Sequence, residues 1–436
     1  MKRYAIHTLG CKVNFAESST IGRALERAGY QRVAPFAEAE IYVVNSCSVT
    51  EHADKKCRNI VRRLHRINPQ ARIAVTGCYA QLSGPAIAAI DGVCLVVGNN
   101  DKEDLPRLLL EPDDDRAPRI YGCRPDEIVR FFPAFSCGDR TRSFLKVQDG
   151  CDYCCSYCTI HAARGKSRNQ PIANLVREAE QIAASGVREI VLTGVNTGDF
   201  GRTTGERFID LLRALDRVTG IERYRISSIE PNLLTDEIIA FCASSPRFQP
   251  HFHIPLQSGS DEVLKRMRRR YLTAAFADRI AAVRRAMPDA FLGIDVIVGF
   301  PGESEADFEQ TCRFLTGLAP AYLHVFPFSE RPGTPAVDFP DKVPHAVITD
   351  RAAKLDALCR ELHESFCTRY TGRVARVLFE SSAKRGKMFG FTENYIRVQA
   401  PYDRRLVNRI CRVQLGGWDE SDQSLVAESI EMPREL

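Results

Sequence analysis

The stretch Cys151-Asp-Tyr-Cys-Cys155-Ser-Tyr-Cys158 decides how this chain is interpreted. If Cys154 is left aside, its cysteines follow the spacing C-x3-C-x2-C. Three thiolates this close can bind three irons of one [4Fe–4S] cube. A saturated cube normally takes four cysteines, so one iron stays open for another ligand. A zinc knuckle is the alternative, because zinc needs a fourth ligand and His161 lies nearby.

The composition favours metal ligation over disulfide bonds. The chain has 436 residues, 16 of them cysteine, and a formal net charge of +5. The N-terminus lacks the continuous apolar core of a secretory signal, and no stretch approaches about 18 uninterrupted apolar residues. We therefore expect a cytoplasmic protein without a membrane partner, in a compartment that keeps thiols reduced. Most of the cysteines can equally be small buried hydrophobes, so their spacing has to separate the two roles.

The middle of the chain, residues 137–367, has the rhythm of repeated strand–helix units. Strand-like runs recur at 143–148, 189–193, 224–228, 251–256, 290–299 and 322–328. Six such units in series predict a partial or complete (β/α) barrel. The cysteine motif follows the first of these strands. It therefore lies at the face where barrel enzymes carry their active sites.

An open iron beside three cysteines resembles the radical S-adenosylmethionine (SAM) superfamily, in which that iron binds SAM. The loops after the later strands supply glycines that let a ligand approach the backbone, and polar side chains that suit ribose and amine groups. The candidate SAM-binding residues are Gly194, Asn196, Ser228, Glu230, Gln257, Ser258 and Gly302. No catalytic residue is assigned, because each of these loops also has the composition of an ordinary turn.

A second set of cysteines lies in the first zone, residues 1–117, where apolar strand-like runs alternate with helical patterns. This pattern predicts an α/β domain with a mainly parallel sheet. Cys11, Cys47 and Cys78 each follow one predicted strand. The ends of parallel strands meet at one edge of a sheet, so three cysteines there can converge on one metal site. The alternative is three unrelated small residues in turns.

The third zone, residues 369–431, has short strands separated by turns and predicts a small all-β barrel. Residues 369–412 hold eleven Lys or Arg and three Asp or Glu. Such a surplus suits contact with phosphates, although a charge run is usually a solvated face. The same two interpretations apply to the basic run Lys265-Arg-Met-Arg-Arg-Arg270.

Several motifs together resemble the methylthiotransferases of the radical SAM superfamily over nearly the whole chain. They are Leu9-Gly-Cys-Lys-Val-Asn14, Thr193-Gly-Val-Asn-Thr-Gly198, His253-Ile-Pro-Leu-Gln-Ser-Gly259 and Asp295-Val-Ile-Val-Gly-Phe-Pro-Gly-Glu303. Gly390-Phe-Thr-Glu-Asn-Tyr-Ile-Arg-Val398 is similar to part of the family's RNA-binding TRAM domain. These motifs are closest to the branch that acts on threonylcarbamoyladenosine in tRNA.

The resemblance implies two [4Fe–4S] clusters and SAM. Cys151, Cys155 and Cys158 would bind the cluster of the barrel, and Cys11, Cys47 and Cys78 an auxiliary cluster. The implied reaction adds sulfur and a methyl group at C2 of the modified adenosine next to the anticodon. The implied partners are the tRNA anticodon loop, an electron donor and a sulfur source.

Other substrates and one other class of protein stay open. Isopentenyladenosine in tRNA and a ribosomal protein are alternative substrates within the family. A metal-containing RNA-binding protein without catalysis is the alternative from a different class. The chain also departs from the family at Cys154, where an aromatic residue is usual, and at His161, where proline is usual. We expect Cys155 to be the ligand, because only Cys155 preserves the spacing.

Overall fold

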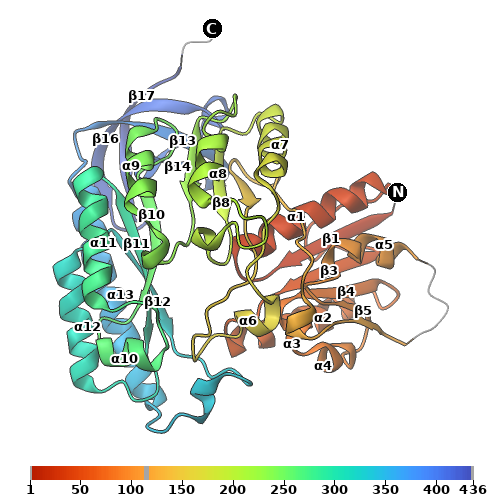
Figure 1. The fold of residues 1–436 in the computed structure, drawn as a ribbon. Helices are drawn as coiled ribbons and strands as arrows, with labels where there is room; N and C mark the ends of the chain where they lie inside the picture. Colours follow the sequence, from red (N-terminus) through yellow and green to blue (C-terminus); the bar gives the residue numbers. More distant parts are fainter. Residues whose placement is uncertain (1, 112–116, 434–436) are drawn as a thin grey trace.

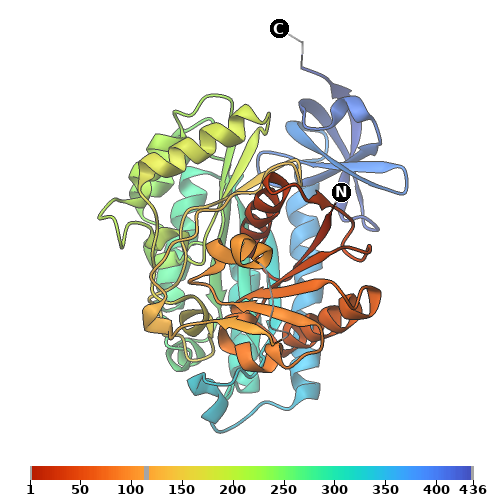
Figure 2. The same ribbon diagram turned by 90° about the vertical axis from the view of Figure 1, so that its right-hand side faces the viewer.

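The computed structural model describes residues 2–111 and 117–433. Three units are visible in Figures 1 and 2: an N-terminal α/β domain, a central layer of strands covered by helices, and a small β barrel at the C-terminal end. This architecture confirms the predicted fold class. The boundaries 1–117, 137–367 and 369–431 stay a prediction.

The N-terminal domain is built on a six-stranded parallel sheet in the order β2-β1-β3-β4-β5-β6. Its central strand β3 is buried along its whole length, as expected for a parallel strand covered by helices on both faces. The strands are β1 Arg3–Thr8, β2 Gln31–Arg32, β3 Ile41–Ser46, β4 Arg72–Gly77, β5 Val93–Val97 and β6 Arg119–Tyr121. The helices are α1 Lys12–Arg27, α2 Glu51–Ile67, α3 Cys78–Leu82, α4 Gly84–Ala88 and α5 Leu105–Leu110, with 3-10 turns at Lys102–Asp104 and Pro125–Glu127.

The central unit is a partial barrel made of two three-stranded parallel sheets, β7-β8-β9 and β10-β11-β12. The sheets adjoin where the Ile229 N–H donates to the His253 carbonyl at 3.1 Å. The strands are β7 Ser143–Lys146, β8 Glu189–Thr193, β9 Arg223–Ile226, β10 His251–Gln257, β11 Phe291–Val298 and β12 Tyr322–Pro327. All six predicted strands are therefore present, each within a few residues of its expected position.

Helices follow these strands and bury the outer face of the sheets in one large apolar core. They are α6 Ile160–Arg164, α7 Ile172–Ala184, α8 Phe208–Leu215, α9 Asp236–Ser244, α10 Asp261–Arg266, α11 Thr273–Ala286, α12 Glu305–Leu318 and α13 His345–Thr368. The 3-10 turns of this unit are Thr197–Asp199, Pro231–Leu233 and Pro335–Asp338.

The C-terminal unit is a closed barrel in the order β13-β14-β15-β17-β16. Its strands are β13 Val374–Lys384, β14 Lys387–Phe391, β15 Arg397–Pro401, β16 Ile410–Asp419 and β17 Ser424–Glu431, with a 3-10 turn at Arg404–Leu406. Closure leaves no free sheet edge. Phe379, Val413 and Leu415 are fully buried inside it.

Two buried arginines of β9 join the central unit to the C-terminal barrel. Arg223 donates to the carbonyls of Arg376 at 2.7 Å and Phe391 at 3.0 Å. Arg225 donates to the carbonyl of Glu393 at 2.7 Å and forms an ion pair with Glu189 at 2.8 Å. A guanidinium offers five donors, so one arginine can satisfy several carbonyls across an interface.

A buried charge cluster joins the N-terminal domain to the central unit. Glu17 of α1 accepts from Lys102 at 2.6 Å, from Lys146 of β7 at 2.8 Å and from Arg164 of α6 at 3.1 Å. Arg164 also pairs with Asp149 at 2.8 Å. We call these five residues the interdomain charge cluster. Burying charges is costly unless they are paired, so their pairing specifies how the two domains dock.

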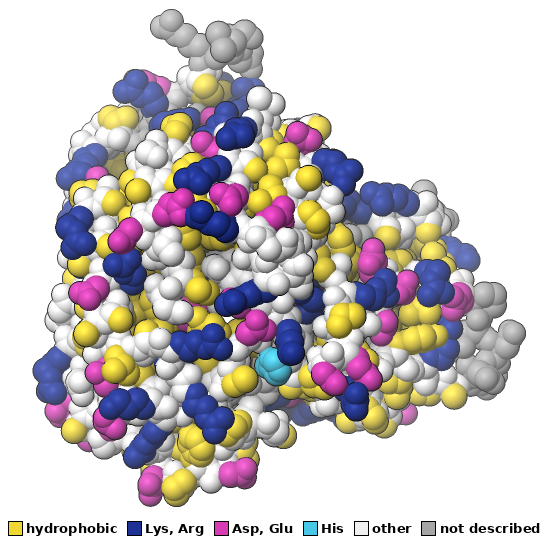
Figure 3. Space-filling model, viewed as in Figure 1, with side chains coloured by type: hydrophobic (Ala, Val, Ile, Leu, Met, Phe, Trp, Pro, Cys, Tyr) yellow, Lys and Arg dark blue, Asp and Glu magenta, His cyan; other side chains and the backbone are white. Residues whose placement is uncertain are grey.

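The outer surface is mixed in charge. On the face seen in Figure 3, Lys and Arg side chains are interspersed with Asp and Glu and do not gather in one patch. No described helix combines the length and the apolar character needed to cross a membrane.

Candidate active site

The motif Cys151–Cys158 lies in the loop between β7 and α6, at the carboxyl end of the first barrel strand. Its backbone curls around its own sulfurs: the Tyr153 N–H donates to the Cys151 Sγ at 3.4 Å, and the Ile160 N–H donates to the Cys158 Sγ at 3.4 Å. Such backbone donors suit a sulfur that carries negative charge. The loop is therefore arranged for thiolates.

Cys155, and not its neighbour Cys154, belongs to this arrangement. Cys155 is buried, and its Sγ accepts from Arg269 at 3.2 Å, whereas Cys154 is exposed. His161 lies against the same loop, with Nδ1 2.8 Å from the Cys151 carbonyl. The side chain of His161 is thus engaged with backbone, which favours a positioning role over zinc ligation.

Burial sets the protonation of these thiols. Burial, together with the neighbouring thiol of Cys155, raises the pKa of Cys158 to about 12. Burial also raises the pKa of Cys151. The thiols of Cys151 and Cys158 are therefore neutral until a metal displaces their protons, as is usual for cysteine ligands.

The second cysteine set converges at one edge of the N-terminal sheet. Cys11 is the N-cap of α1 after β1, Cys47 follows β3, and Cys78 begins α3 after β4. Burial and then the Cys78 thiol raise the pKa of Cys47 to about 12, with a further contribution from Cys11. Among the described residues, which include all sixteen cysteines, no disulfide bond is formed.

Gly10 and Gly77 allow this convergence. Both have positive φ, 90° and 97°, and a Cβ on Gly10 would lie 2.7 Å from the Cys47 Sγ. A Cβ on Gly77 would lie 2.3 Å from the Ser46 carbonyl. Only glycine accepts both this backbone conformation and this close approach.

The two cysteine sets lie beside each other. Thr159, next to Cys158, donates to the carbonyl of Ser48, next to Cys47, at 3.3 Å. Arg164, at the end of the motif's helix, donates to the Cys78 Sγ at 3.4 Å. The two cysteine sets therefore lie in one region of the molecule.

A cavity of about 230 Å³ lies between Cys158 of the barrel set and the loop that follows Cys47. It is lined by Thr50 after Cys47, by Cys158, and by Gln257 and Asp295 from the barrel strands. Gln257 has a φ of 74°, a conformation that non-glycine residues rarely adopt. Such strain concentrates at binding sites, where the surrounding structure enforces it.

Buried polar atoms near this face fit a polar cofactor. Among the described residues, Asn196 Nδ2 and Ser227 Oγ are buried without a hydrogen-bond partner. Such groups normally find a partner, so an amino acid or ribose group of SAM would satisfy them. The donors and thiols present thus fit an iron–sulfur cluster with SAM.

The other SAM candidates take different places. Gly194 packs against Gln148, and the Ser228 backbone carbonyl accepts from Thr197. Glu230 pairs with Arg269. Ser258 is fully buried, with its hydroxyl 3.4 Å from that of Thr311. Gly302 leaves room for the Arg266 guanidinium, which a Cβ would displace. Contact of these seven residues with SAM stays a prediction.

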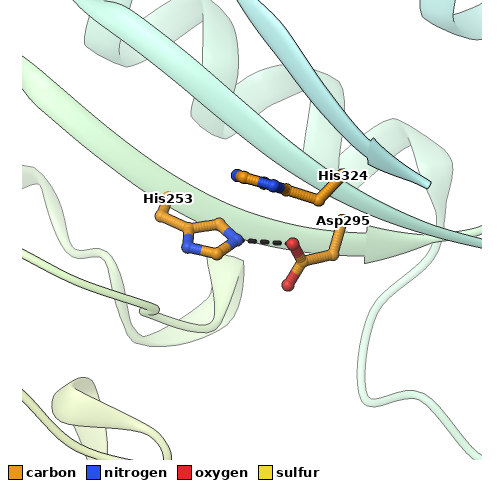
Figure 4. Close-up of side chains that lie close together, drawn as sticks. All are labelled: His253, Asp295 and His324. Carbon is orange, nitrogen blue, oxygen red and sulfur yellow. Dashed lines mark hydrogen bonds and ion pairs between the residues drawn. The ribbon is translucent and has the colours of Figure 1, made fainter. Parts of the chain in front are cut away.

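The barrel interior contains a polar group that sequence reasoning missed: His253 of β10, Asp295 of β11 and His324 of β12. Figure 4 shows the His253 ring directed at the Asp295 carboxylate, to which it is bonded, with the His324 ring alongside. Burial and the nearby His253 lower the pKa of His324 to about 4, so this ring is neutral at physiological pH. The sequence signal that could have identified this group is the alternation of residues along the three adjacent strands.

The ligand atoms of these three residues lie within 4.8 Å of one another. Among the described residues, no three cysteines come as close as this to one another.

Arg269 was also missed as a site residue. Its basic run suggested a solvated or phosphate-binding face, but Arg269 is buried between Cys155 and Glu230. Lys265 of the same run is exposed and pairs with Glu262. A run of basic residues in the sequence does not by itself show which of its side chains is buried and which is exposed.

Comparisons with known proteins agree with this geometry. Residues 145–315 match the Radical SAM superfamily, and residues 3–98 match "Uncharacterized protein family UPF0004". The chain is 40% identical over 426 residues to the threonylcarbamoyladenosine tRNA methylthiotransferase MtaB of Bacillus subtilis, covering 95% of this chain and 94% of that protein.

Further relatives carry two different names. The chain is 37% identical to MtaB of Thermotoga maritima, covering 91% of each chain. It is also 37% identical to a tRNA-2-methylthio-N(6)-dimethylallyladenosine synthase of Acidothermus cellulolyticus, covering 86% of this chain and 77% of that protein. The radical SAM methyltransferase TsrM of Kitasatospora setae shares the fold, with a TM-score of 0.57 and 15% identity over 77% of this chain and 74% of TsrM.

Family membership implies SAM and a [4Fe–4S] cluster. The identity extends over nearly the whole chain, and the central unit matches the radical SAM superfamily. The chain belongs to the methylthiotransferase family of radical SAM enzymes.

Proposed function

We propose that this enzyme adds sulfur and a methyl group at C2 of N6-threonylcarbamoyladenosine, next to the anticodon of tRNA, with two [4Fe–4S] clusters and SAM. The observation that carries the proposal is that two cysteine triads lie beside each other, next to a cavity that is lined by Cys158 of one triad and by Thr50 from the loop after Cys47. The names of the B. subtilis and T. maritima relatives support the choice of substrate.

We assign a different cluster to each triad. Cys151, Cys155 and Cys158 would hold one cluster, and Cys11, Cys47 and Cys78 the other. When bound, the barrel cluster with SAM supplies the radical chemistry and the second cluster presents the sulfur. Arg269 and Arg164 each place a guanidinium beside one triad, where it stabilises thiolate charge.

The barrel interior has to hold the base dry and close to both triads, since radical transfer needs reacting atoms at near-attack distance. The adenine has to leave the stack of the anticodon loop, as in other enzymes that act on bases. Loop RNA is already partly unstacked, which lowers this cost. Gln257 and Asp295 are placed to meet a polar base edge in the cavity.

The remaining partners follow from this reaction. An electron donor has to reduce the barrel cluster, and a sulfur source has to replace the sulfur transferred. The C-terminal barrel, with its surplus of Lys and Arg, would contact phosphates of the tRNA. An enzyme acting on tRNA would work in the cytoplasm.

The test is reconstitution of the full chain with iron and sulfide under anaerobic conditions. SAM, a reductant and one of three anticodon stem–loop RNAs are then added, carrying threonylcarbamoyladenosine, dimethylallyladenosine or plain adenosine. We expect mass spectrometry of the nucleosides to show a methylthio group only on the first. A methylthio group only on dimethylallyladenosine would instead place this chain with the relative from A. cellulolyticus. Failure on all three RNAs would direct the search to a ribosomal protein.

A further inference from the structure

A second cavity, also of about 230 Å³, lies beside the N-terminal cysteine set, where all three units of the molecule meet. We call it the Lys12 pocket. Its polar lining comprises Cys11, Lys12, Arg140, Arg142, Arg225, His251 and Tyr395. The first two belong to the N-terminal domain, Tyr395 belongs to the C-terminal barrel, and the rest come from the central unit.

The positive charges of this pocket outnumber the negative charges paired with them. Arg225 pairs with Glu189 at 2.8 Å, and Arg142 pairs with Glu380 at 3.0 Å. Lys12 has no carboxylate of a described residue within salt-bridge distance. A recessed ammonium without a counterion favours an anionic ligand, because burying an unpaired charge is costly.

His251 gives a second, independent indication of a ligand. It is 8% exposed and lines the pocket, yet its Nδ1 has no hydrogen-bond partner among the described residues. Burial, with the nearby cations of Arg225 and Lys12, lowers the pKa of His251, so the ring is neutral. A neutral ring nitrogen without a partner can bond a hydroxyl or amide of a bound molecule.

Tyr395 is held in place from both sides. Its φ is 63°, in the left-handed region that aromatic residues seldom occupy. Its hydroxyl accepts from Arg142 at 3.1 Å, and its ring centroid lies 4.4 Å from that of His251. The pocket is therefore a built site with fixed polar groups.

We propose that the Lys12 pocket binds the carboxylate of the N6 substituent of the substrate adenosine, with Lys12 as the charge partner and His251 bonding a polar group of the same substituent. This inference rests on the proposed function, because a threonylcarbamoyl group ends in an amino acid carboxylate. The pocket adjoins Cys11, so a substituent seated there keeps the adenine near the N-terminal triad.

The same pocket would reject a dimethylallyl group. That substituent is apolar, and placing it here would desolvate Lys12 and leave His251 unpaired. A site built around polar groups discriminates strongly against an analogue that lacks their partners. Lys12 is thus a specificity-determining residue that separates the two substrates of the named relatives.

The first test changes the ligand and leaves the protein intact. The reconstituted full chain is titrated with a stem–loop RNA carrying threonylcarbamoyladenosine, and with the same RNA as its carboxylate methyl ester. We expect the ester to bind roughly 10- to 100-fold more weakly, as for loss of one partner of a buried charge pair. Equal affinities would overturn the inference.

The second test is a double-mutant comparison. The variant Lys12→Gln should lose affinity for the acid, show little further loss for the ester, and bind the plain adenosine RNA like the wild type. Lys12→Arg should retain preference for the acid. Lys354→Gln, which removes an exposed lysine paired with Asp350, is the matched control and should change none of these affinities.

The iron content of Lys12→Gln is measured in parallel, since Lys12 adjoins Cys11. If Lys12→Gln lost the same amount of affinity for the acid RNA and for the ester RNA, Lys12 would not be the charge partner of the carboxylate. The outcomes separate this inference from the proposed function. Methylthiolation of the threonylcarbamoyl RNA without an acid–ester difference refutes the carboxylate pocket alone, whereas absence of methylthiolation refutes the function.

Discussion

Neighbouring residues of the same type have different environments in this protein, and Cys154 and Cys155 are the clearest pair. They share a peptide bond, but one thiol faces solvent and the other lies buried beside Arg269. Spacing favours Cys155, and the structure agrees through burial and a hydrogen bond.

The first prediction concerns this pair. Cys155→Ala should remove one cluster, about half of roughly eight irons per chain for two cubes, and abolish methylthiolation. Cys154→Ala should retain iron, sulfide and activity. Iron and acid-labile sulfide analysis of both reconstituted variants makes the comparison. If Cys154→Ala lost iron and Cys155→Ala did not, the cluster would be bound by Cys154 in place of Cys155.

The second prediction concerns Arg269, whose buried guanidinium faces both Cys155 and Glu230. Burial raises the pKa of Glu230 even with Arg269 beside it. Arg269→Gln removes the compensating charge and should lower the free energy of unfolding by about 3 kcal/mol. Urea titration of the chain without metal measures this change. Lys265→Gln, at an exposed pair in the same basic run, should leave the transition unchanged, and equal effects of the two variants would contradict the role of Arg269.

At the scale of elements, α1 performs two tasks. Its N-terminus places Cys11 and Lys12 at the site, and five residues after Lys12 the side chain of Glu17 enters the interdomain charge cluster. The docking of α1 against β7 therefore determines the position of the N-terminal triad relative to the barrel.

The third prediction follows from the charge of Glu17. Burial alone would raise the pKa of Glu17, but Arg164, Lys102 and Lys146 outweigh it and hold the pKa well below its ordinary value. A carboxyl whose folded pKa is depressed contributes stability above its unfolded pKa of about 4, and this contribution is lost as the pH falls. Glu17→Gln should therefore lower stability at pH 7 by about 3 kcal/mol and weaken the loss of stability on acidification.

Urea titrations between pH 7 and pH 3 measure this effect. Glu309→Gln, at an exposed pair on α12, is the control and should follow the wild-type curve. An unchanged acid dependence in Glu17→Gln would show that other carboxylates govern the acid transition.

At the scale of the molecule, the three units are connected around one site. The Lys12 pocket is lined by residues from all three units. The arginines of β9 also donate hydrogen bonds to backbone carbonyls of the C-terminal barrel. The C-terminal barrel is thus more than an attached RNA-binding module. It contributes Tyr395 to the wall of the proposed substrate pocket.

The fourth prediction concerns the surface that meets tRNA. Arg404 and Arg405 lie in an exposed 3-10 turn of the C-terminal barrel. If they contact phosphates, their joint replacement by Gln should weaken tRNA binding and reduce the slope of log affinity against log salt by about one per lost contact. Binding titrations from low to high salt give the slope. Arg313→Gln, exposed on α12, is the control, and an unchanged slope in the double variant would place the RNA elsewhere.

Much of this molecule was predictable from local pattern. The six barrel strands follow from apolar runs at regular intervals, and the N-terminal cysteines follow from their positions after strands. Phe389, one of several aromatic residues of the C-terminal barrel, is buried, as its place in a short strand suggests. Strand periodicity and cysteine spacing are properties of short stretches, so the sequence by itself determined the three-unit fold and the family, and it predicts the two cysteine triads.

Only the tertiary structure decided which charged residues matter. Arg269 and Lys265 belong to one basic run, and Lys12 is a single lysine next to a cysteine, so neither pattern shows burial. His253, Asp295 and His324 become neighbours only because β10, β11 and β12 align in register. Burial and pairing of a charge depend on residues far away in the chain, and these distances are set when the domains pack together.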